Sequence, residues 1–269
     1  SKTAPNVENH YLPHAVDGDI FTRLPQETMD AFKEESFPEH DDRMIFFWNN
    51  RNARRKHSGT LIKAFNDFAE EVGPENVCLI MHTDPLDPHG QDLETLMRDF
   101  DIADGRITIS RQKIPPEGLA LMYNMADCTI NISDAEGFGL STLESLSCGT
   151  PIIVNMTGGL QEQVTDGEEW FGLGLEPDAK ALIGSQDVPY IYEDRLSSEK
   201  ISKALKEMYS MSPEEREELG RKGAKYVSEN YNFEQFKERW IDLVDNIIEN
   251  HGSWDTRKGY KSWDLKEVL

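Results

Sequence analysis

The amino-acid sequence predicts an α/β fold in which a doubly wound, mostly parallel sheet is followed by a C-terminal helical tail. Over the first two thirds of the chain, short apolar runs alternate with segments of helical spacing. This alternation is the pattern of repeated strand and helix units. From about residue 197 onward the spacing is helical throughout, which predicts the tail.

Five apolar runs are expected to form the strands of the sheet. They occupy residues 44–48, 76–81, 107–109, 128–132 and 151–154. Helices are expected between them, at about 58–72, 91–100, 116–126 and 140–148. Ligands bind such sheets at the carboxyl ends of the strands, so the loops that follow the strands are the places to search for a site.

The remaining segments are expected to be one insertion and several helices. Residues 171–175 and 189–192 are expected to be strands joined by an irregular loop. Ser212 and Pro213, followed by two glutamates, mark a helix start, and the helices of the tail are expected to form a bundle. A Ser-Trp-Asp sequence at 253–255 recurs at 262–264, and its tryptophans are expected to dock on a neighbouring surface.

Composition excludes several classes of partner and location. Fifty acidic residues against 28 basic ones give a formal net charge of −22, which repels nucleic acid and anionic membrane surfaces. Three cysteines in apolar stretches do not fit a secreted disulfide framework. The sequence shows neither a spanning apolar run nor a signal peptide. We therefore expect a soluble, cytoplasmic protein.

The stretch SDAEGFGLSTLESLSCGTPIIVNMTGG, residues 133–159, predicts an anion site. A strand ends before it, glycines permit unusual backbone angles, and a helix begins at about Gly139. A helix N-terminus holds phosphate through free backbone amides and its positive dipole end. We expect the amides of Gly137, Phe138, Gly139 and Leu140 to face a pyrophosphate.

Two glutamates flank this helix start. Glu144 lies on the helix stripe that is expected to face inward, so it needs either a buried basic partner or the hydroxyls of a ligand. Glu136 stands in the loop, about 7 to 8 Å away along the helix axis. This spacing suits a pyrophosphate between the two carboxylates. The alternative is a solvated Glu136 and a structural ion pair at Glu144.

At these residues the sequence resembles family 4 of the glycosyltransferases, whose donor domain carries two glutamates separated by seven residues. The flanking sequences at 143–151 and 157–162 are also similar to that family. The resemblance implies the Rossmann-like donor half of a GT-B enzyme, which binds a nucleoside diphosphate sugar and transfers the glycosyl group with retention. It assigns Glu136 to the transferred sugar and Glu144 to the ribose diol.

A basic segment at residues 50–57 follows the first strong strand. Four positive charges in so acidic a chain predict an anionic ligand, although a solvated basic loop is the alternative. Arg51 and Lys56 match the spacing of an arginine and a lysine that embrace the donor diphosphate in the family. Two further arginines lie between them, and Asn50 stands where the family usually has glycine.

Three other segments bear on ligand binding. Residues 11–17 resemble the junction between the two halves of the family's enzymes, and His14 within them is expected to be structural. Residues 82–89 offer possible metal ligands, but a proline-rich loop is favoured. Residues 112–117 correspond to the family's nucleobase region. No cofactor and no metal are expected, since Arg51, Lys56 and the helix start are expected to stabilise the departing diphosphate.

The resemblance also predicts the organisation of the chain. We expect a junction at 1–17, the donor domain at 18–195, helices of the same domain at 196–250 and a tail at 251–269. The acceptor domain is expected to be absent from this chain and to lie upstream of it in the full-length protein. The sequence does not indicate whether the acceptor is a glycan, a lipid or a small molecule. Any membrane contact is not expected through this domain. The alternatives are a non-enzymatic nucleotide-sugar-binding module, or a GT-B epimerase or phosphorylase.

Overall fold

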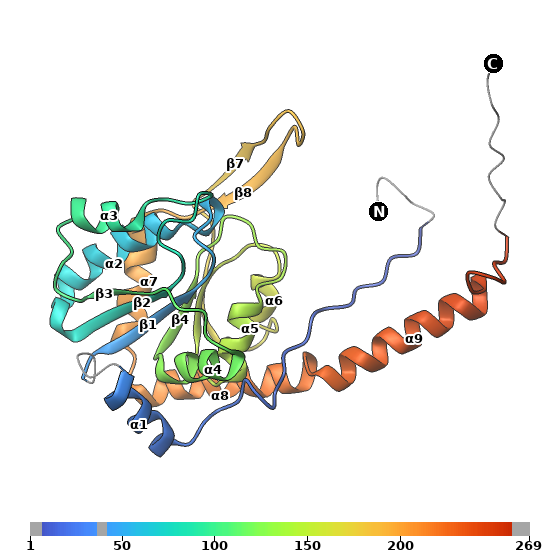
Figure 1. The fold of residues 1–269 in the computed structure, drawn as a ribbon, viewed down its shortest axis with the longest axis horizontal. Coiled ribbons are helices and arrows are strands. Elements are labelled where there is room, and N and C mark those ends of the chain that lie inside the picture. Colours follow the sequence, from blue (N-terminus) through green and yellow to red (C-terminus); the bar gives the residue numbers. More distant parts are fainter. Residues whose placement is uncertain (1–6, 37–41, 260–269) are drawn as a thin grey trace.

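The central element is a six-stranded parallel sheet with the order β3-β2-β1-β4-β5-β6. The computed structural model describes residues 7–36 and 42–259. The strands of the sheet are β1 (Met44–Asn49), β2 (Val77–His82), β3 (Ile107–Ser110), β4 (Cys128–Asn131), β5 (Ile152–Asn155) and β6 (Gly172–Leu175). The chain proceeds outward from β1 to β3 and then returns to place β4 beside β1 (Figure 1). This topology confirms the predicted doubly wound α/β fold.

Helices cover both faces of the sheet. They are α1 (Gln26–Ser36), α2 (Ser58–Val72), α3 (Leu93–Asp99), α4 (Pro116–Met125), α5 (Leu140–Ser147), α6 (Leu160–Val164), α7 (Ser198–Ser210) and α8 (Pro213–Asn230). A further helix, α9 (Phe233–His251), has no buried residue. In β1, Phe46 and Trp48 pack with α2 and α7, whereas Ile45 and Phe47 pack with α4 and α5. A parallel sheet covered on both faces accounts for its unbroken apolar runs.

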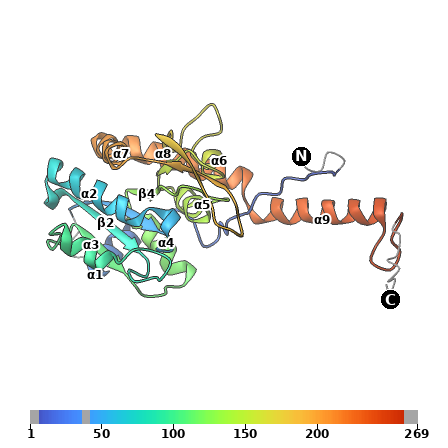
Figure 2. The same ribbon diagram turned by 90° about the horizontal axis from the view of Figure 1, so that it is seen from above.

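The C-terminal helices do not form the predicted bundle. Helix α7 packs against α2 on one face of the sheet, and α8 packs against α5 on the other face. Helix α9 extends away from the domain in both views (Figures 1 and 2). The prediction was wrong because the apolar stripes of α7 and α8 complete the two faces of the sheet instead of meeting each other.

The insertion after β6 is an ordered hairpin rather than the predicted irregular loop. Strands β7 (Ala179–Ile183) and β8 (Ile191–Arg195) pair antiparallel, with Leu182 opposite Tyr192. The hairpin projects from the domain (Figure 1). The strands expected at 171–175 and 189–192 overlap β6 and β8, whereas β7 falls in the stretch expected to be a loop. Cross-strand pairing with β8 stabilises β7.

Both ends of the described chain extend beyond the domain (Figures 1 and 2). Residues 7–15 leave the domain on the same side as α9 (Figures 1 and 2). Trp254 is 78% exposed, and the Arg257 guanidinium lies 4.1 Å from the centre of its ring. The second Ser-Trp-Asp sequence falls outside the described residues. Among the helices described, none has both the length and the apolar composition needed to cross a bilayer.

Candidate functional site

The predicted site residues cluster where the sheet reverses its strand order. The loop that follows β1 carries the basic segment, and the loop that follows β4 carries Glu136 and leads into α5. Because β1 and β4 are neighbouring parallel strands, both loops emerge at the same edge. Such a topological switch point is where open α/β sheets bind ligands.

Lys56 and Glu136 form a buried ion pair between these two loops. Lys56 ends a short 3-10 helix, η2 (Arg54–Lys56), and its Nζ contacts Glu136 Oε2. The two side chains are only 9% and 11% exposed. Burial acts to raise the pKa of Glu136, but the hydrogen bond and charge of Lys56 outweigh it and hold that pKa below its usual value. Burial lowers the pKa of Lys56, and Glu136 opposes this effect.

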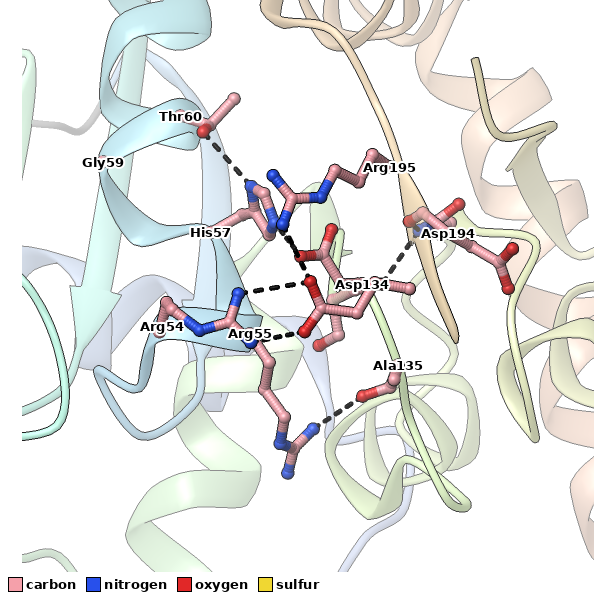
Figure 3. Close-up of polar contacts among 12 residues, drawn as sticks. Arg54, Arg55, His57, Gly59, Thr60, Asp134, Ala135, Asp194 and Arg195 are labelled. Atoms are coloured by element: carbon pink, nitrogen blue, oxygen red, sulfur yellow. Dashed lines mark hydrogen bonds and ion pairs between the residues drawn. The ribbon is translucent and has the colours of Figure 1, made fainter. Parts of the chain in front are cut away.

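Arg51, which was predicted to act with Lys56, and Arg55, which was not, take different places in the structure. Arg55 donates to the Ala135 carbonyl at 2.8 Å (Figure 3). Its guanidinium also lies 3.5 Å from Glu136 Oε2. Arg51 is held by Asp87, with a 2.6 Å contact from Nε, and by the His89 ring. Lys56 and Glu136 are therefore brought together, with Arg55 rather than Arg51 beside them. Both arginines belong to the same basic segment, so sequence spacing alone could not decide which of them lies beside Glu136.

The N-terminus of α5 lies beside this pair, as predicted. Gly139 caps the helix with a φ of 95°, a conformation in which a Cβ is strained. Within the part of the chain that the structure describes, the amides of Gly137, Phe138 and Gly139 have no backbone acceptor. At Gly158, whose φ is 49°, a Cβ would lie 1.7 Å from the Glu136 carbonyl oxygen. The second glycine turn thus packs directly against the loop that carries Glu136.

Glu144 lies on α5, half-buried, with a neutral partner that the sequence did not reveal. The Tyr123 hydroxyl donates to Glu144 Oε2 at 2.8 Å, and Asn49 donates to the Tyr123 oxygen at 2.9 Å. Burial raises the pKa of Glu144, and the hydrogen bond from Tyr123 opposes that rise. Among the described residues Glu144 makes no ion pair, so the alternative of a structural ion pair at Glu144 is not seen. One carboxylate oxygen remains available to hydroxyl donors.

A cavity of about 540 Å³ extends the site along the carboxyl ends of β1, β2 and β3. Its lining residues are Asn49, Asn50, Arg51, His82, Thr83, Asp84, Ser110, Arg111, Gln112 and Lys113. The cavity thus joins Arg51 to the start of the segment at 112–117 that was predicted to lie near a nucleobase. Polar side chains dominate the lining, which suits a hydrogen-bonding ligand.

Two further predicted features can be placed. No three His, Cys, Asp or Glu side chains gather into a metal site within residues 7–36 and 42–259, and Asp87 and His89 of the suspected metal loop hold Arg51 instead. His14, expected to be structural, lies with its ring edge-on to Phe138, at 5.1 Å between ring centres. His14 therefore lies against the loop that precedes α5.

Comparison with known proteins relates this arrangement to one family. The family profile described as glycosyl transferases group 1 matches residues 29–226. A GDP-mannose-dependent alpha-(1-6)-phosphatidylinositol monomannoside mannosyltransferase from Mycolicibacterium smegmatis is 30% identical over 176 residues, which cover 62% of this chain and 44% of that protein.

Solved structures share the fold at low sequence identity. Sucrose-phosphate synthase from Thermosynechococcus elongatus superimposes with a TM-score of 0.70 at 24% identity, over 90% of this chain and 53% of that one. Anabaena HepE in complex with UDP-glucose gives a TM-score of 0.68 at 13% identity, over 86% and 56%. The chain thus spans about half the length of these proteins or less. Since the family profile covers most of the chain, this protein belongs to the group 1 glycosyltransferases.

Proposed function

We propose that this chain binds a nucleoside diphosphate sugar at the edge formed by the loops after β1 and β4, as the donor half of a retaining glycosyltransferase. The observation that carries the proposal is the buried Lys56–Glu136 pair beside the amides of Gly137, Phe138 and Gly139, which have no backbone acceptor among the described residues. A cation and a helix N-terminus at one point create a site for a diphosphate. The complex of Anabaena HepE with UDP-glucose supports this class of ligand.

The chemistry required of the site is stabilisation of a departing diphosphate. The amides of α5, Lys56 and the half-exposed guanidinium of Arg55 supply a positive field that needs no metal ion. A bound diphosphate competes with Glu136 for Lys56. Glu136 is then released to accept hydrogen bonds from the sugar, while Glu144 accepts from the ribose diol. Retention of configuration is part of this proposal, and the resemblance to family 4 of the glycosyltransferases supports it.

We also propose that acceptor binding needs a second domain outside these residues. Transfer requires the acceptor hydroxyl within about 3 to 3.5 Å of the anomeric carbon, which demands walls on both sides of a cleft. The sheet edge described here supplies one wall, and the related proteins are about twice as long. The three cysteines are unpaired and buried, which supports work in a reducing, cytoplasmic compartment.

Calorimetry in excess EDTA tests the proposed binding. UDP, UDP-glucose, GDP and GDP-mannose are titrated into the protein, and one nucleotide is expected to bind without metal. Lys56→Ala is expected to weaken that binding by about 1 to 3 kcal/mol. Lys206→Ala is the matched control, because Lys206 pairs with Glu71 on the surface far from the site and its loss changes the net charge equally. Binding that requires Mg²⁺, or equal effects of both variants, would contradict the proposal.

A further inference from the structure

His57 has a backbone conformation that residues with a Cβ rarely adopt. It follows Lys56 directly and caps α2, with φ 57° and ψ 34°. Glycine takes these angles freely, whereas a side chain strains the backbone. Strained residues persist where surrounding contacts hold them, and they gather at functional sites. The contacts of the His57 ring are therefore informative.

The ring of His57 reaches a buried carboxylate. Nε2 lies 2.5 Å from Asp134 Oδ2, as an ion-pair contact whose atoms are not aligned as a hydrogen bond, and Nδ1 lies 3.2 Å from Thr60 Oγ1 (Figure 3). The Asp134 side chain is 1% exposed and that of His57 17%. A carboxylate so deeply buried needs a compensating partner, and His57 is in place to supply it.

The His57–Asp134 contact joins the same two loops as the Lys56–Glu136 pair. His57 is one residue after Lys56, and Asp134 is two residues before Glu136. The Asp134 amide also donates to the Arg55 carbonyl at 2.8 Å. The loop after β1 and the loop after β4 are thus joined at successive points, of which the Lys56–Glu136 pair is only one.

The β7–β8 hairpin supports the same junction. Glu193 on β8 is almost fully buried and accepts from Arg54 at Oε1 and Oε2 and from Arg195 at 2.9 Å. The amide of the next residue, Asp194, donates to the Asp134 carbonyl at 2.8 Å (Figure 3). Three chain segments therefore meet around Asp134. Little freedom remains for its carboxylate to move without moving the loops.

We propose that His57 and Asp134 are positioning residues that hold Lys56 and Glu136 in register for the sugar portion of the donor. The proposal rests on the proposed function of the site. Productive sites need their groups held within fractions of an ångström, and a second layer of buried contacts provides that precision. The strain at His57 is then the consequence of directing an imidazole, which glycine lacks, at Asp134.

Asp134→Asn and His57→Gly test the proposal through the ratio of UDP affinity to UDP-glucose affinity. Each variant is expected to reduce the preference for UDP-glucose over UDP by about tenfold, the size of the charge-assisted hydrogen bond that a misplaced Glu136 would lose to the sugar. The double variant is expected to lose no more than either single one, because the two residues act as one unit. GDP and GDP-mannose are the second ligand pair. Asp104→Asn is the control. It changes a partner of the buried Arg106, which lies just before β3 at the amino ends of the strands, whereas the candidate site lies at their carboxyl ends.

Hydrogen exchange without ligand separates this inference from the proposed function. Faster exchange in residues 52–58 and 132–140 of both variants, but not of Asp104→Asn, is expected even if no nucleotide binds. If Asp134→Asn fails to fold, His57→Gly carries the test, because glycine relieves the strained backbone. Unchanged ligand preference in a nucleotide-binding His57→Gly variant, unchanged exchange, or additive losses in the double variant would overturn the positioning role.

Discussion

Replacing Lys56 by methionine is expected to destabilise the fold through the carboxylate it leaves behind. Lys56→Met keeps the length of the buried side chain but removes the charge that compensates Glu136. Removal of one partner from a buried pair costs about 3 to 5 kcal/mol. We expect about 3 kcal/mol at neutral pH, because the Arg55 guanidinium remains 3.5 Å from the same carboxylate oxygen.

The loss should depend on pH in a defined direction. In the parent protein the folded pKa of Glu136 lies below its usual value of 4.5, so its contribution to stability is present above pH 4.5 and lost as the pH falls through the folded pKa. Without Lys56, burial raises the folded pKa above 4.5. The contribution is then present below pH 4.5 and lost as the pH rises. The difference between the two proteins therefore grows from acid to neutral pH.

Urea unfolding of both proteins at about pH 4.5 and about pH 7.5 measures this difference. The double variant Lys56→Met/Glu136→Gln is the control, since it removes both charges of the pair and is expected to recover more than half of the loss. An equal loss at both pH values, or a double variant as unstable as Lys56→Met, would refute the buried ion pair as the source of the effect.

Three further outcomes are expected. Nucleotide affinity should rise as the pH increases from about 4.5, because burial raises the pKa of Glu144 and only its carboxylate accepts from both ribose hydroxyls. Glu144→Ala should abolish both this pH dependence and the discrimination against a 2′-deoxynucleotide. Calorimetry that shows neither effect of Glu144→Ala would remove Glu144 from the site. Gly158→Ala should destabilise the protein by about 2 to 4 kcal/mol in urea unfolding, since its Cβ would meet the Glu136 carbonyl; Gly18→Ala, with open space around it, is the control. Burial raises the pKa of Cys78 and Cys148 to about 12 and also raises that of Cys128, so a thiol reagent at about pH 8 should label none of them until the protein is unfolded; rapid labelling of the native protein would contradict their burial.

The site was predictable from sequence to the extent that local backbone chemistry defines it. Gly139 before an amphipathic helix predicts an anion site without any knowledge of the fold, because helix ends leave their amides free. Lys56 and Glu136 lie 80 residues apart, and only the family resemblance placed them at one site. The partner of Glu144 was not predictable, because an internal phenol on a neighbouring helix leaves no periodic signal. Arg51 and Arg55 lie in the same loop, so only the structure could show which of them lies beside Glu136.

Apolar periodicity by itself determined the strands, most of the helices and the α/β class, since burial on two faces of a sheet demands unbroken apolar strands. Tertiary structure alone decided which helices meet and where the charges lie. Helices α7 and α8 cover opposite faces because the apolar stripe of each helix packs on a face of the sheet rather than on the other helix. His57, Asp134 and Glu193 are unremarkable in sequence and become one buried cluster only when three segments meet. The apolar pattern of a sequence indicates which residues are buried, whereas pairing between charges far apart in the sequence depends on the topology that brings them together.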